Sequence, residues 1–385
     1  MKLLKPRTED KQKLTISRFL MGCTVAIMTL VTLVQGLTAQ APAAAHAAAA
    51  RRGRTVMYVY DSANLGLRAE DASRIDQINY AFALIENGEA TGSHWRGIRE
   101  MSTYLKQHPS VDGVLSVGGW GADGFSQACA TEEGRVKLTN SILKLMDEYG
   151  FIGVDIDWEY PGSSAAGIAS SKNDVENWYK LLELLRSGLD ARKTQAGRSY
   201  YLSVAVGVNQ ASNIDAAKLN RSVDQIVLMA YDLRGYDRQT GHHAGLYPAG
   251  NNAESGAYGV KKLVSGGMAK NKILLGIPAY GRMWRQVSGG GDGFDQRAGT
   301  SGNRSINYTD VQALEGQGYT RYYDEEAQAA WWFDGSNFVS GEDEQSLRYK
   351  ARWILDQGLL GSAVWAYSHD KDSSVTRILN EELAQ

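Results

Sequence analysis

Eight short apolar runs alternate with longer amphipathic segments from residue 54 onward, and this alternation constrains the fold more than any other feature of the sequence. Several runs are apolar at almost every position, which is typical of strands buried on both faces of a parallel sheet. Eight strands joined by helices predict an α/β fold, a (β/α)8 TIM barrel, with a doubly wound open sheet as the alternative. The expected strands are 55–60, 77–84, 112–117, 151–158, 200–206, 225–231, 272–277 and 362–367. The expected helices are 97–107, 132–149, 174–192, 214–220, 257–268, 344–357 and 374–383.

One connection is much longer than the others. Between Tyr280 and Glu342 lie about sixty residues with scattered aromatic side chains and short strand-like pieces at 305–308, 320–324 and 330–333. We expect a small α+β insertion at about 283–342, after strand 7. Loops at this end of barrel strands carry function in many enzymes.

The first fifty residues predict an export signal. Six basic residues lie within residues 1–18, an apolar run follows from Phe19 to Leu37, and alanine-rich sequence completes the segment. This order is typical of a secretory signal peptide followed by a linker, and the favoured interpretation is cleavage and secretion from a bacterial cell. The run is also long enough for an uncleaved signal anchor, which is the alternative. Residues 51–385 then form the expected catalytic barrel.

Charge and cysteine content narrow the range of partners. The formal net charge of the chain is −2, and removing residues 1–50, with six basic and two acidic groups, makes it about −6. The chain has no excess of basic residues, so its charge gives no indication that it binds nucleic acid. If the segment containing Cys23 is removed, Cys129 is the only cysteine left, so no intramolecular disulfide can form. We expect a monomer that has no stable association with a membrane once the signal is cleaved.

The strongest chemical signal is the segment from Phe151 to Gly162, in which three acids follow one another at every second residue. Because side chains alternate faces along a strand, Asp155, Asp157 and Glu159 should point into the barrel, opposite Trp158. Three stacked carboxylates repel one another, so at least one should hold a proton near neutral pH. Glu159 is the outermost, at the end of the strand where barrel active sites lie, and it is the natural general acid. A structural network of buried acids is the alternative.

Six segments together resemble one known family. The acidic strand is similar to the aromatic-Asp-Gly-x-Asp-x-Asp-x-Glu signature of glycoside hydrolase family 18, the chitinase family, with Ile152 replacing the usual Asp or Asn. Ile152 should point outward, so we expect a change in packing there. The other similar segments are Asn79-Tyr80-Ala81-Phe82, Ser116-Val117-Gly118-Gly119-Trp120, Met229-Ala230-Tyr231-Asp232, Gly276-Ile277-Pro278-Ala279-Tyr280-Gly281-Arg282, and the insertion ending in Tyr323-Asp324-Glu325.

The resemblance implies a retaining mechanism in which the substrate assists its own cleavage. Glu159 would be the general acid and base, and Asp157 would orient the acetamido group of a bound N-acetylglucosamine. Asp155 would share a proton or hydrogen bond with Asp157 and adjust its pKa. Tyr231 would donate a hydrogen bond to the acetamido group.

The resemblance also implies a set of substrate-binding residues, with Trp365 as the aromatic floor of the sugar site. Tyr80 and Phe82 should share one face of their strand and could line the pocket, with burial in the core as the alternative. His242 and His243 lack a metal-ligand frame, so neither a metal nor a cofactor is expected. The expected binding residues are Tyr80, Phe82, Gly118, Gly119, Trp120, Met229, Asp232, Tyr280, Arg282, Trp284 and Trp365.

The leading hypothesis is therefore a secreted glycosidase that hydrolyses β-1,4-linked N-acetylglucosamine polymers, namely chitin or chitooligosaccharides. One alternative keeps the fold and acts on peptidoglycan or N-glycan cores. Another is a non-catalytic chitin-binding lectin, although Glu159, Asp157 and Tyr231 are all present.

Overall fold

The computed structural model describes residues 53–197 and 199–385. The predicted signal segment 1–50, including Cys23, lies outside the described residues. Within them, no helix has the length and apolar character needed to cross a membrane.

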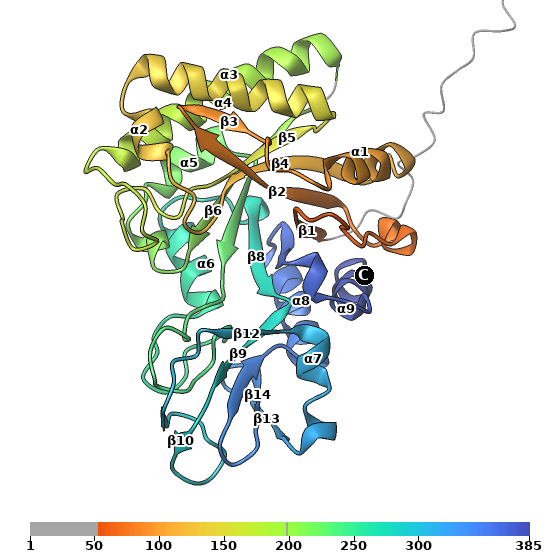
Figure 1. Cartoon of the computed structure of the whole chain (residues 1–385), viewed down its shortest axis with the longest axis vertical. Helices are drawn as coiled ribbons and strands as arrows, with labels where there is room; N and C mark the ends of the chain where they lie inside the picture. Colours follow the sequence, from red (N-terminus) through yellow and green to blue (C-terminus); the bar gives the residue numbers. More distant parts are fainter. Residues whose placement is uncertain (1–52, 198) are drawn as a thin grey trace, which may run out of the picture. The chain divides into compact units, whose positions relative to one another are not determined.

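Eight parallel strands close into a barrel in the order β1-β16-β8-β7-β6-β5-β4-β2. Figure 1 shows several of these strands, among them β2, β4, β5 and β8. The ring is completed because β1 pairs with both β2 and β16. The TIM barrel is confirmed, and the open-sheet alternative is wrong. The barrel strands are β1 (Arg54–Tyr60), β2 (Gln77–Glu86), β4 (Asp112–Gly118), β5 (Gly153–Asp157), β6 (Tyr201–Gly207), β7 (Gln225–Met229), β8 (Ile273–Pro278) and β16 (Gly361–Trp365), with β3 (Glu89–Thr91) added antiparallel to β2.

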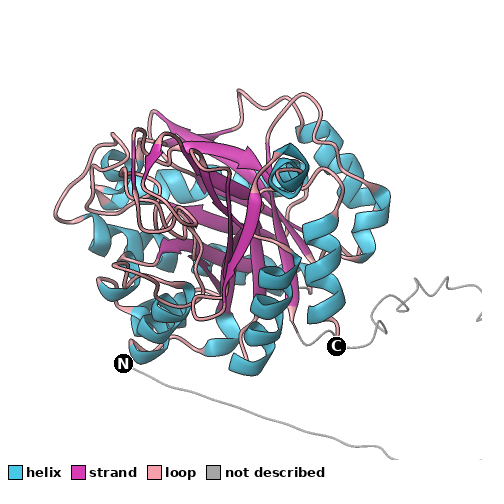
Figure 2. Cartoon of the chain, turned by 90° about the horizontal axis from the view of Figure 1, so that it is seen from below, coloured by secondary structure: helices cyan, strands magenta, loops and turns pink. Residues whose placement is uncertain are grey.

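Helices surround the barrel strands (Figure 2). Helix α3 (Glu132–Tyr149) shows how local sequence determines where a helix begins and ends. The side chain of Thr131 caps its first turn, and Gly150, in a left-handed conformation, ends it. The α-helices around the barrel are α1 (Ile98–Gln107), α2 (Phe125–Cys129), α3 (Glu132–Tyr149), α4 (Asp174–Ala196), α5 (Ala216–Ser222), α6 (Gly256–Ser265), α8 (Glu344–Gln357) and α9 (Ser374–Leu383). The short 3-10 turns are η1 (Ala69–Ser73), η2 (Gln210–Ser212), η3 (Lys270–Lys272), η4 (Glu315–Gln317) and η5 (Tyr367–His369).

The expected insertion follows the seventh barrel strand, β8, as an antiparallel sheet in the order β12-β9-β15-β14-β13. Its first strand, β9, already begins at Tyr280. A strand was expected at 305–308, but Tyr308 begins helix α7. The elements of the insertion are β9 (Tyr280–Trp284), β10 (Val287–Ser288), β11 (Arg297–Ala298), β12 (Arg304–Asn307), α7 (Tyr308–Gln312), η4, β13 (Thr320–Asp324), β14 (Ala329–Phe333) and β15 (Phe338–Gly341).

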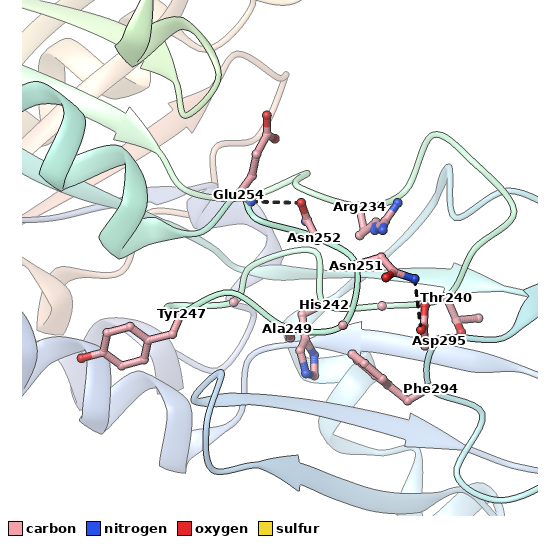
Figure 3. Close-up of a pocket in the computed structure, with 13 residues that line it drawn as sticks. Arg234, Thr240, His242, Tyr247, Ala249, Asn251, Asn252, Glu254, Phe294 and Asp295 are labelled. Atoms are coloured by element: carbon pink, nitrogen blue, oxygen red, sulfur yellow. Dashed lines mark hydrogen bonds between the residues drawn. The ribbon is translucent and has the colours of Figure 1, made fainter.

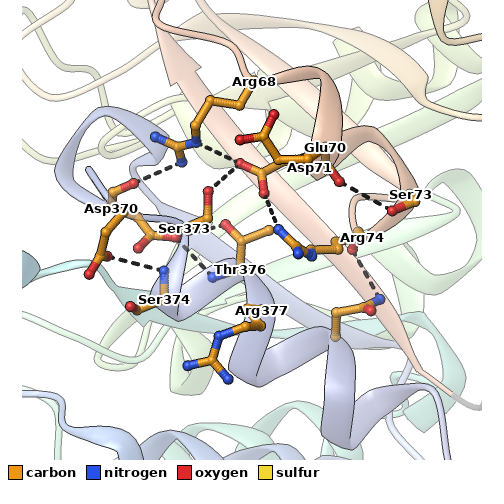
Figure 4. Close-up of polar contacts among 12 residues, drawn as sticks. Arg68, Glu70, Asp71, Ser73, Arg74, Asp370, Ser373, Ser374, Thr376 and Arg377 are labelled. Carbon is orange, nitrogen blue, oxygen red and sulfur yellow. Dashed lines mark hydrogen bonds and ion pairs between the residues drawn. The ribbon is translucent and has the colours of Figure 1, made fainter.

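A buried polar network joins the two ends of the described chain (Figure 4). The carboxylate of Asp71, in η1, accepts hydrogen bonds from Arg68 at 2.9 Å and Arg74 at 2.9 Å. The hydroxyls of Tyr367 and Ser373 donate to the same carboxylate at 2.8 Å and 2.6 Å. These bonds stabilise the seam at which the first and last barrel strands meet.

Candidate active site

The acids of β5 point into the barrel, as their alternation predicts. Asp155 and Asp157 are buried, and the intervening apolar side chains belong to the core outside the sheet. There Trp158 stacks on Phe125, with ring centroids 5.0 Å apart. Ile152 also packs against this outer core, so the prediction that it points away from the acids is confirmed.

Asp155 is held by hydroxyl groups from three other barrel strands. Tyr58 of β1 donates to it at 3.0 Å, Ser116 of β4 at 2.7 Å and Ser203 of β6 at 2.5 Å. Burial raises the pKa of Asp155, and these three donors oppose that effect. The negative charge of Asp155 helps to raise the pKa of Asp157, so Asp155 affects this pKa through its charge.

Asp157 and Glu159 form a coupled pair at the carboxyl end of β5. Burial raises the pKa of Asp157 well above its usual range, and the charge of Glu159 raises it further. One carboxylate oxygen of Asp157, Oδ1, has no hydrogen-bond partner in the described part of the chain. Burial raises the pKa of Glu159 to about 7, and the negative charge of Asp232 contributes. A carboxyl group with this pKa can both donate and accept a proton near neutral pH.

Asp232 is held as an anion beside this pair. Arg282 donates to it through Nε at 2.7 Å and Nη2 at 2.5 Å, and the Tyr280 hydroxyl donates at 2.8 Å. Burial alone would raise the pKa of Asp232, but the neighbouring His243 ring and the hydrogen bonds from Arg282 lower it well below its usual range. Burial raises the pKa of Tyr231, so its hydroxyl remains a hydrogen-bond donor. The structure thus brings Tyr231, Asp232, Tyr280 and Arg282 together.

Trp365 lies at the end of β16 in an aromatic group inside the mouth of the barrel. Its ring stacks on Phe82 with centroids 5.6 Å apart, and Tyr58 and Tyr60 contact it at 5.7 Å and 6.3 Å. Met229 belongs to the same inner cluster. The partly exposed indole of Trp365 provides the flat apolar surface on which a sugar ring can stack.

A second aromatic group lies across the tip of β4. Trp120 is 55% exposed, stacks near Tyr236 with centroids 6.5 Å apart, and meets Tyr160 edge-on at 6.3 Å. Neither Tyr236 nor Tyr160 is among the binding residues predicted from the sequence. Tyr160 directly follows Glu159, and Tyr236 lies four residues after Asp232, so their closeness to predicted site residues was the available signal.

Gly118 and Gly119 permit close packing below these aromatic rings. Both have positive φ angles, of 115° and 92°. A Cβ atom on Gly118 would lie 2.2 Å from the backbone oxygen of Asp157, and one on Gly119 would lie 2.6 Å from the Phe82 ring. These glycines shape the site through the space they leave, as the sequence indicated.

Two predicted binding residues do not line the site. Tyr80 is fully buried in the outer core, where it stacks on Phe151 and hydrogen-bonds Asp61, whereas Phe82 packs inside the barrel. The prediction that they share a face is wrong, because the register of β2 shifts between Ala81 and Ala83. Trp284 has no exposed surface and fills the core of the insertion, so its predicted subsite contact is also wrong.

The ring of His242 is within hydrogen-bond distance of Asp324, and the ring of His243 packs against Tyr280. His242 Nε2 lies 3.2 Å from Asp324 Oδ2, and His243 Nδ1 lies 3.6 Å from Asp232 Oδ1. A small pocket next to His242, lined by Arg234 and Asp295 among others, has a volume of about 10 Å³ (Figure 3). This volume accommodates about one water molecule and excludes a sugar.

The barrel combines two carboxyl groups of raised pKa with a partly exposed indole at the barrel mouth. These are the groups that a glycosidase needs for acid catalysis and for binding a sugar ring. Comparison with known proteins makes the class more specific. The family model named Glycosyl hydrolases family 18 matches residues 54–370, so the chain belongs to this family, and the predicted resemblance is confirmed. Within the family the chain is chitinase-like.

Individual relatives support this placement. Chitinase A1 of Niallia circulans is 32% identical over 310 residues, which cover 74% of this chain and 44% of that protein. Chitinase 1 of Aphanocladium album is 28% identical over 389 residues, covering 90% of both chains. The solved structure of a family 18 N-acetylglucosaminidase from Paenibacillus barengoltzii has a TM-score of 0.82 and 34% identity, over 86% of this chain and 99% of that chain.

Proposed function

We propose that this protein hydrolyses β-1,4-linked N-acetylglucosamine chains by a retaining mechanism in which the substrate's acetamido group is the nucleophile. The observation that carries the proposal is the Glu159 carboxyl, whose pKa burial raises to about 7 beside the buried Asp157. The confirmed family supports this assignment, since family 18 is an exception to the use of a protein nucleophile.

Each step uses a residue of the site. Glu159 donates its proton to the glycosidic oxygen while the acetamido carbonyl oxygen attacks the anomeric carbon. The bond between that carbon and the glycosidic oxygen breaks, the rest of the chain leaves as an alcohol, and a cyclic oxazolinium remains. Asp157 accepts a hydrogen bond from the acetamido N–H and stabilises the positive charge. Tyr231 donates to the acetamido oxygen. Glu159 then takes a proton from water as the water opens the ring, so the original anomeric configuration returns.

Two chain-length preferences follow from the relatives. The relatives named as chitinases support a chitin chain as substrate, whereas the relative named as an N-acetylglucosaminidase supports release of a single sugar. We propose cleavage within chitooligosaccharides as the main activity. Release of N-acetylglucosamine from an end is the second candidate.

The experiment is hydrolysis of tetra-N-acetylchitotetraose followed by NMR of the first product anomer. The proposal predicts the β anomer initially. The matched control substrate is the same tetrasaccharide without acetyl groups, which should resist cleavage because it has no internal nucleophile. The α anomer as first product, or equal cleavage of both substrates, would refute the mechanism.

We also propose that the protein acts outside the cell, as the signal-like sequence 1–50 indicates. N-terminal sequencing of protein from the culture medium tests this. A new N-terminus near residues 39–50 is expected, and full-length protein retained in the membrane fraction would favour the signal anchor.

A further inference from the structure

His243 lies beside the ion pair of Asp232 and Arg282, and no step of the proposed mechanism uses it. Its side chain has no exposed surface, and its Nδ1 is 3.6 Å from Oδ1 of Asp232. That same oxygen accepts the hydrogen bonds from the Tyr280 hydroxyl and from Nε of Arg282. His243 is therefore a third group that faces one carboxylate oxygen of Asp232.

The position of His243 is fixed from the insertion and from the barrel. Its backbone N–H donates to the Ser340 hydroxyl of β15 at 3.0 Å, and its carbonyl oxygen accepts from the Leu233 N–H at 3.0 Å. Leu233 directly follows Asp232 in the chain. The ring of His243 packs against the ring of Tyr280 in β9, with centroids 5.3 Å apart. Two strands of the insertion sheet thus determine where the imidazole lies relative to Asp232.

The surroundings of His243 determine its charge. Burial lowers the pKa of His243 from its usual value of 6.5, and the charge of Arg282 lowers it further. Asp232 and Glu342 oppose this effect, and Glu342 is itself paired with Lys350. The ring is therefore neutral at neutral pH, and the carboxylate that faces Nδ1 favours the tautomer with its proton on that atom.

We propose that His243 is a positioning residue, whose neutral ring keeps the Asp232 carboxylate against Arg282 and beside the coupled acids Asp157 and Glu159. It acts through Asp232, because its own side chain is fully buried. The inference rests on the proposed function, in which Glu159 is the general acid. The negative charge of Asp232 adds to the effect of burial in raising the pKa of Glu159, so displacement of Asp232 should lower that pKa.

The first experiment measures the pairing of His243 with Asp232 and needs no substrate. The protein is labelled with ¹⁵N-histidine, and the ring signals of His243 are assigned from His243→Asn and followed from about pH 8 to about pH 4. The titration midpoint should lie below 6.5. Asp232→Asn should lower it further, by about half a pH unit or more, because the variant removes the negative charge and leaves Arg282 in place. A midpoint above 6.5, or the same midpoint in both proteins, would overturn the proposal.

The second experiment measures kcat/KM for tetra-N-acetylchitotetraose against pH, whose descending limb near pH 7 reports the proton of Glu159. His243→Leu removes the ring that faces Asp232 and should move this limb to lower pH by about half a unit or more. His243→Asn keeps a hydrogen-bond donor near the position of Nδ1 and should keep the limb in place. The matched control is His242→Leu, which removes the neighbouring buried ring that faces Asp324 and should also leave the limb in place.

A lower rate in His243→Leu with an unmoved limb would show a structural role alone and would overturn the proposal. Equal shifts in His243→Leu and His242→Leu would do the same, because they would show a general loosening of the insertion. The titration midpoints in the unmodified protein and in Asp232→Asn are measured with His243 intact, so the test does not depend on the folding of the leucine variants. If the unmodified protein does not cleave the tetrasaccharide, the proposed function fails, while these midpoints still report whether His243 and Asp232 interact.

Discussion

The raised pKa of Glu159 should be visible in the stability of the protein. In the folded state the pKa is about 7, against an ordinary value of 4.5. A carboxyl whose folded-state pKa is raised contributes stability at low pH, and this contribution is lost as the pH rises through the folded-state pKa. At 1.36 kcal/mol for each pH unit between the two values, the loss is about 3 kcal/mol.

The perturbation is Glu159→Gln, which keeps the shape of the side chain and removes its ionisation. The free energy of unfolding of the variant, minus that of the unmodified protein, should rise by about 3 kcal/mol between pH 4 and pH 9. Urea unfolding followed by tryptophan fluorescence at both pH values measures this difference. Glu326→Gln, at an exposed glutamate, is the matched control and should show almost no change. A pH-independent difference for Glu159→Gln would refute the reasoning.

Three further predictions follow from the site and the fold. The kcat/KM for chitotetraose should fall as pH rises above about 7, because Glu159 must hold a proton to act as acid; a rate that is flat to pH 9 would contradict this. Trp365→Ala should raise KM about tenfold, from the loss of roughly 1.4 kcal/mol of stacking, and an unchanged KM would contradict the floor assignment. Asp71→Asn should lower the free energy of unfolding by about 3 kcal/mol in urea titrations, while leaving kcat per folded molecule unchanged, and undiminished stability would contradict the role of the network.

Much of the barrel could be predicted because its signals are local. Apolar runs mark strands buried on both faces, and the alternation of acids with Val154, Ile156 and Trp158 determines which side chains enter the barrel. The long connection after the seventh strand could also be identified as an insertion from its length.

Other features depend on packing between distant segments. The register shift in β2 separates Tyr80 from Phe82, and period-two alternation alone does not reveal it. Trp284 is buried because the insertion needs a core of its own. The hydroxyl of Tyr58 reaches Asp155 across 97 residues of sequence, a contact created only by closure of the barrel.

The measurement that tests the central claim most directly compares the full chain with Glu159→Gln on a chromogenic N,N′-diacetylchitobioside, with binding of chitotetraose measured in parallel. Loss of the general acid should lower kcat by about a hundredfold or more while the oligosaccharide still binds. Equal rates in the two proteins would contradict the assignment of Glu159. Binding without hydrolysis in both proteins would replace the glycosidase with a lectin.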